Sequence, residues 1–191
     1  STLTASLLIK KLKTDYDEVN FISEGVKNIV KTGNDVAILV RAGWQGQTIV
    51  EKLEEEGLSY HWTWAYNHIG YDRYHEGVAV LSRTPIQASE LLVSDVNDPT
   101  DYHTRRIAIA ETQVDGKDIA VASVHLSWWD KGFQQEWARL EERFSQLQKP
   151  LILAGDFNNP AGQEGYEAIL ASPLALQDSF IEARQTKGTY T

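Results

Sequence analysis

The stretch KPLILAGDFNNP, residues 149–160, decides how this chain folds. Four apolar residues lie between Pro150 and Gly155 and are bounded by turn formers, which is typical of a strand buried on both faces. Gly155 allows a sharp backbone turn where the carboxylate of Asp156 emerges. Asp156 and Asn158 alternate with their neighbours, so in extended geometry their side chains share one face. The stretch predicts a buried strand that ends in a polar loop.

An acid and an amide at a strand end have several uses. Asp156 and Asn158 could orient a water molecule, hold a divalent cation or hydrogen-bond a phosphate. The alternative is an Asx turn that only closes the strand. These residues alone leave both interpretations open.

The composition is that of an ordinary soluble globular protein. The 191 residues are 42% apolar and 24% charged, which suits a single domain with a sizeable core. A net charge of −9 argues against a broad basic surface for nucleic acid, although acidic groups suit catalysis with hard cations. The chain has no Cys, which excludes disulfides, thiolate zinc sites and cysteine nucleophiles.

Membrane and export signals are weak. No apolar run reaches the length of a transmembrane segment, and the opening STLTASLLIKKLK lacks the charged start of a signal peptide. We therefore expect a cytoplasmic protein without a transmembrane segment, with secretion as the alternative.

Apolar periodicity predicts helices interleaved with strands. The predicted helices are residues 17–32, 47–56, 130–148 and 162–171. Apart from the opening stretch, the predicted strands are residues 3–9, 35–40, 60–66, 76–82, 106–114 and 117–126. Asp115-Gly116 predicts a two-residue type I′ hairpin between the last two strands, and residues 85–104 are expected to form a loop. Hairpins mixed with β-α-β units predict an α/β protein with mixed sheets and helices on the outside.

Further polar residues stand at the ends of predicted strands. His125 ends one strand, Glu76 begins another, and Arg105 with Arg106 opens a third. Taken singly, they are more often a structural histidine, a solvated carboxylate and edge charges. Each residue alone therefore leaves its function open.

Four segments in this order resemble one known family. They are HEGVAVLSR (75–83), TRRIAIAE (104–111), VASVHLSWW (121–129) and LILAGDFNNP (151–160). Together they resemble the endonuclease/exonuclease/phosphatase superfamily, the fold of DNase I-like nucleases, neutral sphingomyelinases and inositol polyphosphate phosphatases. The resemblance implies a four-layer α/β sandwich, two packed mixed β-sheets flanked by helices. It also implies metal-dependent hydrolysis of a phosphodiester or phosphomonoester by in-line water attack.

The resemblance assigns a catalytic role to four residues. Asp156 would orient or deprotonate the attacking water, and Asn158 would hydrogen-bond phosphoryl oxygens or a metal. His125 would donate to the transition-state phosphate, while Glu76 holds its ring and favours the charged form.

The resemblance also implies a cofactor and a phosphate-binding arginine. Arg105 would neutralise a non-bridging oxygen, with Arg106 as its rival for that place. The cofactor would be Mg²⁺, or Mn²⁺, with Asp156 and Asn158 as ligands.

The N-terminal part of the chain departs from the family pattern. Ser6 stands where the family carries an Asn, and residues 35–40 run into Arg41 where a Gln-Glu pair with the main metal ligand is expected. Family members also continue to a terminal Ser-Asp-His, and this sequence contains no Met. We expect residues 1–191 to be a single domain whose sequence, as given, lacks some residues and the C-terminal strands. The alternative is a non-catalytic phospholigand-binding module of the same fold that has lost its metal.

Aromatic residues gather near the expected mouth of the site. Tyr71 precedes Glu76, and Trp128 follows His125 closely. Most rings on strands belong to a core, but these two are candidates for binding a nucleobase, a sugar or a lipid headgroup. The expected partner is a phosphoester substrate: a small molecule, a lipid headgroup or nucleic acid. Glycoside hydrolysis by Glu76 and Asp156 is a weaker alternative.

Overall fold

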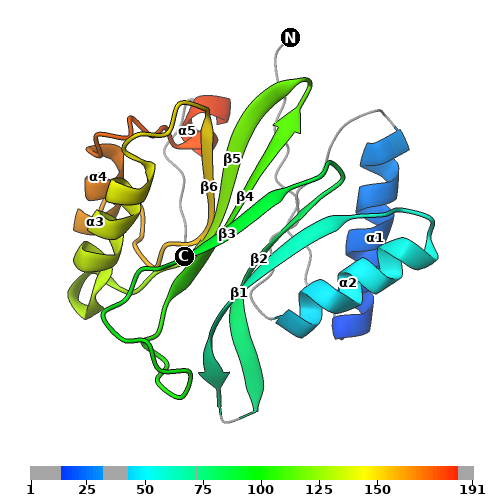
Figure 1. Cartoon of the computed structure of the whole chain (residues 1–191), viewed down its shortest axis with the longest axis horizontal. Helices are drawn as coiled ribbons and strands as arrows, with labels where there is room; N and C mark the ends of the chain where they lie inside the picture. Colours follow the sequence, from blue (N-terminus) through cyan, green and yellow to red (C-terminus); the bar gives the residue numbers. More distant parts are fainter. Residues whose placement is uncertain (1–13, 32–42, 72, 185–191) are drawn as a thin grey trace.

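The computed structural model describes residues 14–31, 43–71 and 73–184, which form a four-layer α/β sandwich (Figure 1). A two-stranded and a four-stranded sheet lie in the middle, and helices cover the outer face of each sheet (Figure 1). This arrangement confirms the fold class predicted from the sequence. In the described part of the chain, no helix combines the length and apolarity needed to cross a membrane.

The smaller sheet contains an irregularity beside the candidate site. Strands β1 (His61–Gly70) and β2 (Tyr74–Ser82) pair antiparallel. The register shifts between Tyr66 and His68, which leaves Asn67 as the extra residue of a β-bulge. As a result His68 stands opposite Glu76.

The larger sheet has the order β3-β4-β5-β6. Strands β3 (Gln87–Leu92), β4 (Arg106–Val114) and β5 (Lys117–His125) are antiparallel neighbours, whereas β6 (Leu151–Asp156) runs parallel to β5. Asp115 and Gly116 have φ angles of 50° and 74°, as a type I′ turn requires, so the predicted hairpin is confirmed. Parallel pairing brings the carboxyl ends of β5 and β6 to the same edge of the sheet.

The helices form the two outer layers. α1 (Asp15–Lys31) and α2 (Gly43–Glu55) lie on the smaller sheet, and an ion pair from Lys27 of α1 to Glu56, the residue after α2, joins the two helices. α3 (Phe133–Phe144), α4 (Glu164–Leu170) and α5 (Ser179–Arg184) lie on the side of the larger sheet (Figure 1).

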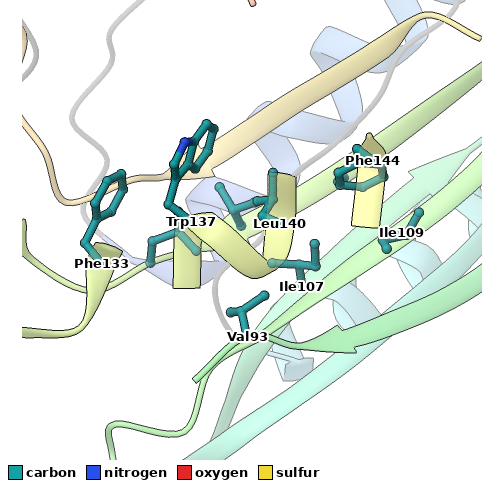
Figure 2. Close-up of a cluster of buried hydrophobic side chains, with 10 residues drawn as sticks. Val93, Ile107, Ile109, Phe133, Trp137, Leu140 and Phe144 are labelled. Atoms are coloured by element: carbon teal, nitrogen blue, oxygen red, sulfur yellow. The ribbon is translucent and has the colours of Figure 1, made fainter. Parts of the chain in front are cut away.

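Three apolar clusters fill the three spaces between the four layers. The cluster between the sheets is made of small side chains: Ala65, Val78, Val80, Ala108, Ala110 and Val121. Alternate residues of the same strands face outward, so Ala79 and Leu81 of β2 pack under α1 and α2. Figure 2 shows the third cluster, in which α3 lies on β4, with Val93, Ile107, Ile109, Phe133, Trp137, Leu140 and Phe144. Strand periodicity therefore produces the layering.

The structure corrects two of the predicted elements. Residues 85–104 are not all loop, because β3 occupies Gln87–Leu92. This strand was missed because it is an exposed edge strand without an apolar alternation, as edge strands often are. The helix predicted at residues 130–148 is shorter, since Gly132, with a φ of 117°, separates a 3-10 turn (Trp129–Lys131) from α3. The predicted strands 3–9 and 35–40, with Ser6 and Arg41, lie outside the described residues.

Of the other predicted elements, β4 is confirmed with its predicted bounds and the rest are confirmed with shifted ends. α2 begins at Gly43 rather than residue 47, and β1 continues to Gly70 rather than ending at residue 66. β5 ends at His125, one residue earlier than predicted.

Candidate active site

The site lies where β5 and β6 end side by side. His125 is the last residue of β5, Asp156 is the last residue of β6, and the two are register partners. His125 Nε2 lies 4.0 Å from Asp156 Oδ2, and the side chains are 16% and 48% exposed. An acid and a histidine therefore stand next to each other with access to solvent.

Gly155 is required at the end of β6. Its φ of 137° belongs to a region that favours glycine, and a Cβ there would lie 2.1 Å from the carbonyl oxygen of Val124 on β5. The predicted sharp turn before Asp156 is thus present, and close approach of the two strands adds a second reason for the glycine.

The loop after Asp156 is an Asx turn. The backbone N–H of Asn158 donates to Asp156 Oδ1 at 2.9 Å, which leaves Oδ2 on the side of His125. Asn158 has a φ of 51°, so the expectation that both side chains share a strand face is wrong. The strand ends at Asp156, and the turn, rather than an extended chain, orients Asn158.

Three side chains hold the backbone that follows His125. The amide of Asn158 donates to Leu126 O at 2.7 Å, and the amide of Asn159 lies 3.3 Å from Ser127 O. From α3, buried Glu136 accepts the N–H and the hydroxyl of Ser127, each at 2.7 Å. The sequence patterns predicted no role for Asn159 or Glu136. Glu136 has no local signal, because it looks like one more polar residue of an amphipathic helix.

Arg105 is the arginine that the structure brings to this cluster. Its burial lowers the pKa of the guanidinium, and the nearby carboxylates of Glu136, Glu76 and Asp156 partly oppose that shift. Its Nε is buried and has no hydrogen-bond partner among the described residues. Arg106 instead donates to the carbonyl of Tyr66 at 2.9 Å and so holds β1. Burial near these carboxylates distinguishes Arg105 from Arg106, and the assignment of the phosphate-binding place to Arg105 stays a prediction.

Glu76 has a partner that the sequence did not predict. Its Oε2 lies 3.3 Å from Nε2 of His68 on the neighbouring strand. The expected support of His125 by Glu76 stays a prediction. His68 was missed because a lone histidine within a strand gives no signal of its own.

The two aromatic candidates are exposed. Tyr71, in the turn between β1 and β2, is 86% exposed, and Trp128, just after β5, is 54% exposed. By contrast, Trp64 and Trp129 pack against apolar clusters. Tyr71 and Trp128 therefore have ring surface available for a ligand, and their binding role stays a prediction.

The oxygen ligands present suit Mg²⁺. Within residues 14–31, 43–71 and 73–184, no group of three or more His, Cys, Asp or Glu side chains could hold a metal. Mg²⁺ needs fewer, since it is usually bound by one or two carboxylates together with water and substrate phosphate. Asp156 offers a half-exposed carboxylate, and Asn158 Oδ1 accepts no hydrogen bond from a described residue. Asp156 and Asn158 are thus the residues that would hold the ion.

The comparisons with known proteins agree with this fold. A family model described as Endonuclease/Exonuclease/phosphatase family matches residues 22–191. An endonuclease/exonuclease/phosphatase family protein from Leptotrichia buccalis C-1013-b is 23% identical with a TM-score of 0.71, over 83% of this chain and 67% of that one. The human Nocturnin catalytic domain with bound sulfate anion is 16% identical with a TM-score of 0.65, over 91% and 70%.

A third solved structure is also similar. ANGEL2, described as a 2′,3′-cyclic phosphatase in complex with adenosine-2′,3′-vanadate, is 19% identical with a TM-score of 0.56, over 81% of this chain and 48% of that one. At these identities the likeness of the solved structures concerns the fold. The comparison with curated proteins found no match.

Proposed function

Because the chain belongs to the endonuclease/exonuclease/phosphatase family, we propose that it is a metal-dependent phosphoesterase. It would hydrolyse a phosphodiester or phosphomonoester by in-line attack of water. The observation that carries the proposal is the His125–Asp156 pair at the ends of two parallel strands, with Arg105 in electrostatic range.

Asp156 is the group that would activate water. One carboxylate oxygen is held by the N–H of Asn158, and the other is left for a water molecule beside His125. The water oxygen forms the new bond to phosphorus as its proton passes to Asp156. The bond from phosphorus to the leaving oxygen breaks, and that oxygen takes up a proton.

His125 and Arg105 would stabilise the charge that develops on the phosphoryl oxygens. His125 donates a hydrogen bond to one oxygen, and Arg105 neutralises another. Positioning and charge neutralisation of this kind supply most of the catalysis in phosphoryl transfer. Glu136, Asn158 and Asn159 keep the backbone after His125 in place, so that the donors are already oriented when substrate binds.

The proposed cofactor is Mg²⁺, with Mn²⁺ as its substitute, held by Asp156 and Asn158. When bound, it would supply positive charge to the phosphoryl oxygens. Asn158 suits this task because its amide nitrogen is already used on Leu126 O, which leaves the amide oxygen for a cation.

Two observations support a substrate class: the anions bound to proteins of similar fold, and the net charge of this chain. Nocturnin is described with sulfate and ANGEL2 with a vanadate of adenosine, and both anions resemble phosphate. With a net charge of −9, a small phosphoester or a lipid headgroup fits better than long duplex DNA. Exposed Tyr71 and Trp128 would contact the part of the substrate beyond the phosphate.

Hydrolysis of bis-p-nitrophenyl phosphate tests the proposal. We expect turnover with Mg²⁺ or Mn²⁺ that EDTA abolishes and that Asp156→Asn or His125→Ala lowers by about 10²- to 10⁴-fold. Asp118→Asn is the matched control, because Asp118 is exposed near the opposite end of β5.

Two outcomes would contradict the proposal. Undiminished turnover in Asp156→Asn would exclude this site. A folded wild-type protein that binds inorganic phosphate without any turnover would support the non-catalytic binding module instead.

A further inference from the structure

His68 lies beside the candidate site at a contact between the two sheets. It follows the β-bulge at Asn67 and stands opposite Glu76. Its side chain is 5% exposed, so its ring nitrogens need polar partners within the protein. β-Bulges often re-aim a side chain next to an active site. The position of His68 thus calls for a functional explanation.

The ring of His68 contacts the smaller sheet and the segment that leads into the larger sheet. Nε2 lies 3.3 Å from Oε2 of Glu76 on β2. Nδ1 lies 3.3 Å from the carbonyl oxygen of Thr104 and 3.4 Å from Nη1 of Arg105, both in the segment that leads into β4. One imidazole therefore stands between the carboxylate and the guanidinium of the candidate site.

Gly70 makes room for the carboxylate of Glu76. A Cβ at Gly70 would lie 2.1 Å from Glu76 Oε1. The backbone of Gly70 is not in the left-handed region, so the missing side chain, rather than an unusual conformation, is what matters here. Glu76 is thus held by His68 on one oxygen and accommodated by Gly70 at the other.

The backbone around His68 is fixed to the larger sheet. Asn67 Oδ1 accepts the N–H of Arg106 at 2.6 Å, and the N–H of Ile69 donates to Pro99 O at 2.8 Å. The residues on either side of His68 are therefore anchored to the β3–β4 segment. A ring whose flanking residues are anchored in this way can keep a fixed position relative to both sheets.

We propose that His68 is a positioning residue that fixes Glu76 relative to Arg105 across the two sheets. The inference rests on the proposed phosphoesterase function, because it concerns how that site is held. Arg105 also donates from Nη1 to the carbonyl oxygen of Tyr102 at 2.9 Å, so the role of His68 is to link the guanidinium to Glu76. A misplacement of about 1 Å in a catalytic group can cost about 10²-fold in rate.

Two substitutions separate the contacts of His68. In His68→Gln, the amide nitrogen can reach the place of Nε2 and keep the contact with Glu76. In His68→Asn, the amide nitrogen stands near the place of Nδ1 and keeps the contact with Thr104 O only. With bis-p-nitrophenyl phosphate we expect His68→Asn to lower kcat by about 10- to 100-fold with little change in KM, and His68→Gln to lower it much less.

Each variant has a control of the same chemical change. His61→Asn and His61→Gln alter an exposed histidine at the far end of β1 and should leave kcat unchanged. Gly70→Ala should reproduce the loss seen in His68→Asn, whereas Gly25→Ala, with open space around it in α1, should not. Circular dichroism melts show which variants fold.

A double-mutant cycle tests the connection to Glu76. Adding His68→Asn to Glu76→Gln should cause little further loss if His68 acts through Glu76. If the losses in kcat of the two single variants multiply in the double variant, or if folded His68→Asn keeps full kcat, the inference is overturned. The proposed function would still stand.

Ring ¹⁵N NMR tests the contact without any turnover. The signals of His68, assigned by their disappearance in His68→Gln, should shift in Glu76→Gln and Gly70→Ala and stay in place in Gly25→Ala. Unchanged signals in Glu76→Gln would overturn the inference. A wild-type protein that lacks turnover but shows the shifts would refute the proposed function and retain His68 as the residue that holds Glu76.

Discussion

At the scale of single residues, side chains of the candidate site also hold backbone. Asn158 uses its amide nitrogen on Leu126 O, so its remaining chemistry is that of an oxygen ligand. Glu136 is more strictly structural, because both of its oxygens accept hydrogen bonds from Ser127 inside the protein. The backbone that follows His125 is thus held both by Asn158 and by Glu136 of α3.

Removal of Glu136 should loosen this support. Glu136→Ala leaves the buried N–H and hydroxyl of Ser127 without their acceptor, which should lower the free energy of unfolding by about 1–3 kcal/mol for each unpaired group. Urea denaturation measures the change. Glu142→Ala, on the exposed face of the same helix, is the control. Equal losses in the two variants would show that the Ser127 contacts contribute nothing.

At the scale of elements, the segment between β3 and β4 is held by two aspartates. The N–H and hydroxyl of Thr100 donate to Asp98, each at 2.8 Å, and the N–H of His103 donates to Asp101 at 2.8 Å. These backbone hydrogen bonds are the main reason that the pKa of Asp98 and that of Asp101 lie below the ordinary value of 3.8. The segment leads directly to Arg105, so its order matters for the site.

Acid should loosen this segment before the sheets. Because both pKa values are lower in the folded protein, the two carboxylates stabilise it fully above about pH 3.8, and their contribution is lost as the pH falls through the folded values. Hydrogen-exchange protection of the Thr100 and His103 amides should therefore fall below that pH, after correction for intrinsic rates. Asp98→Asn and Asp101→Asn should remove the dependence. Protection that stays constant into acid would contradict this account.

At the scale of the whole molecule, the space between the sheets limits which side chains fit. The cluster there contains three alanines, and its largest members are valines. Small residues let the sheets approach, and this approach brings β1 within hydrogen-bonding distance of the segment that opens β4. Glu76 on the smaller sheet is consequently connected through His68 to Arg105, which precedes β4 of the larger sheet.

Enlarging the inter-sheet core should destabilise the protein. Ala110→Leu places a larger side chain between the sheets and should cost about 1–3 kcal/mol of unfolding free energy. Ala88, its register partner on β3, is exposed, so Ala88→Leu should cost much less. Urea unfolding compares the two variants. Similar losses in both would mean that the space between the sheets accommodates the larger side chain.

The sequence by itself determined the elements whose signals are local. The apolar run before Gly155, the alternation of β4 and β5, and Asp115-Gly116 predicted strands and a hairpin that the structure confirms, because neighbouring residues carry this information. The burial predicted for the first of these strands is wrong: Ile152 of β6 is 50% exposed, because β6 is the last strand of its sheet in the described part of the chain. The order of the four segments also predicted the family. The exposed edge strand β3 gave no such signal, since its side chains need not be apolar.

Only the tertiary structure decided how the polar residues of the site are partnered. His68 contacts the Thr104 carbonyl 36 residues away and Arg105 37 residues away, and Glu136 comes to Ser127 from a helix. The sequence does not distinguish Arg105 from Arg106, because the two arginines are adjacent. Their different burial and contacts in the folded chain do distinguish them. The physical reason is that a hydrogen bond depends on position and direction in space. Packing of the two sheets fixes both for residues that lie far apart along the chain.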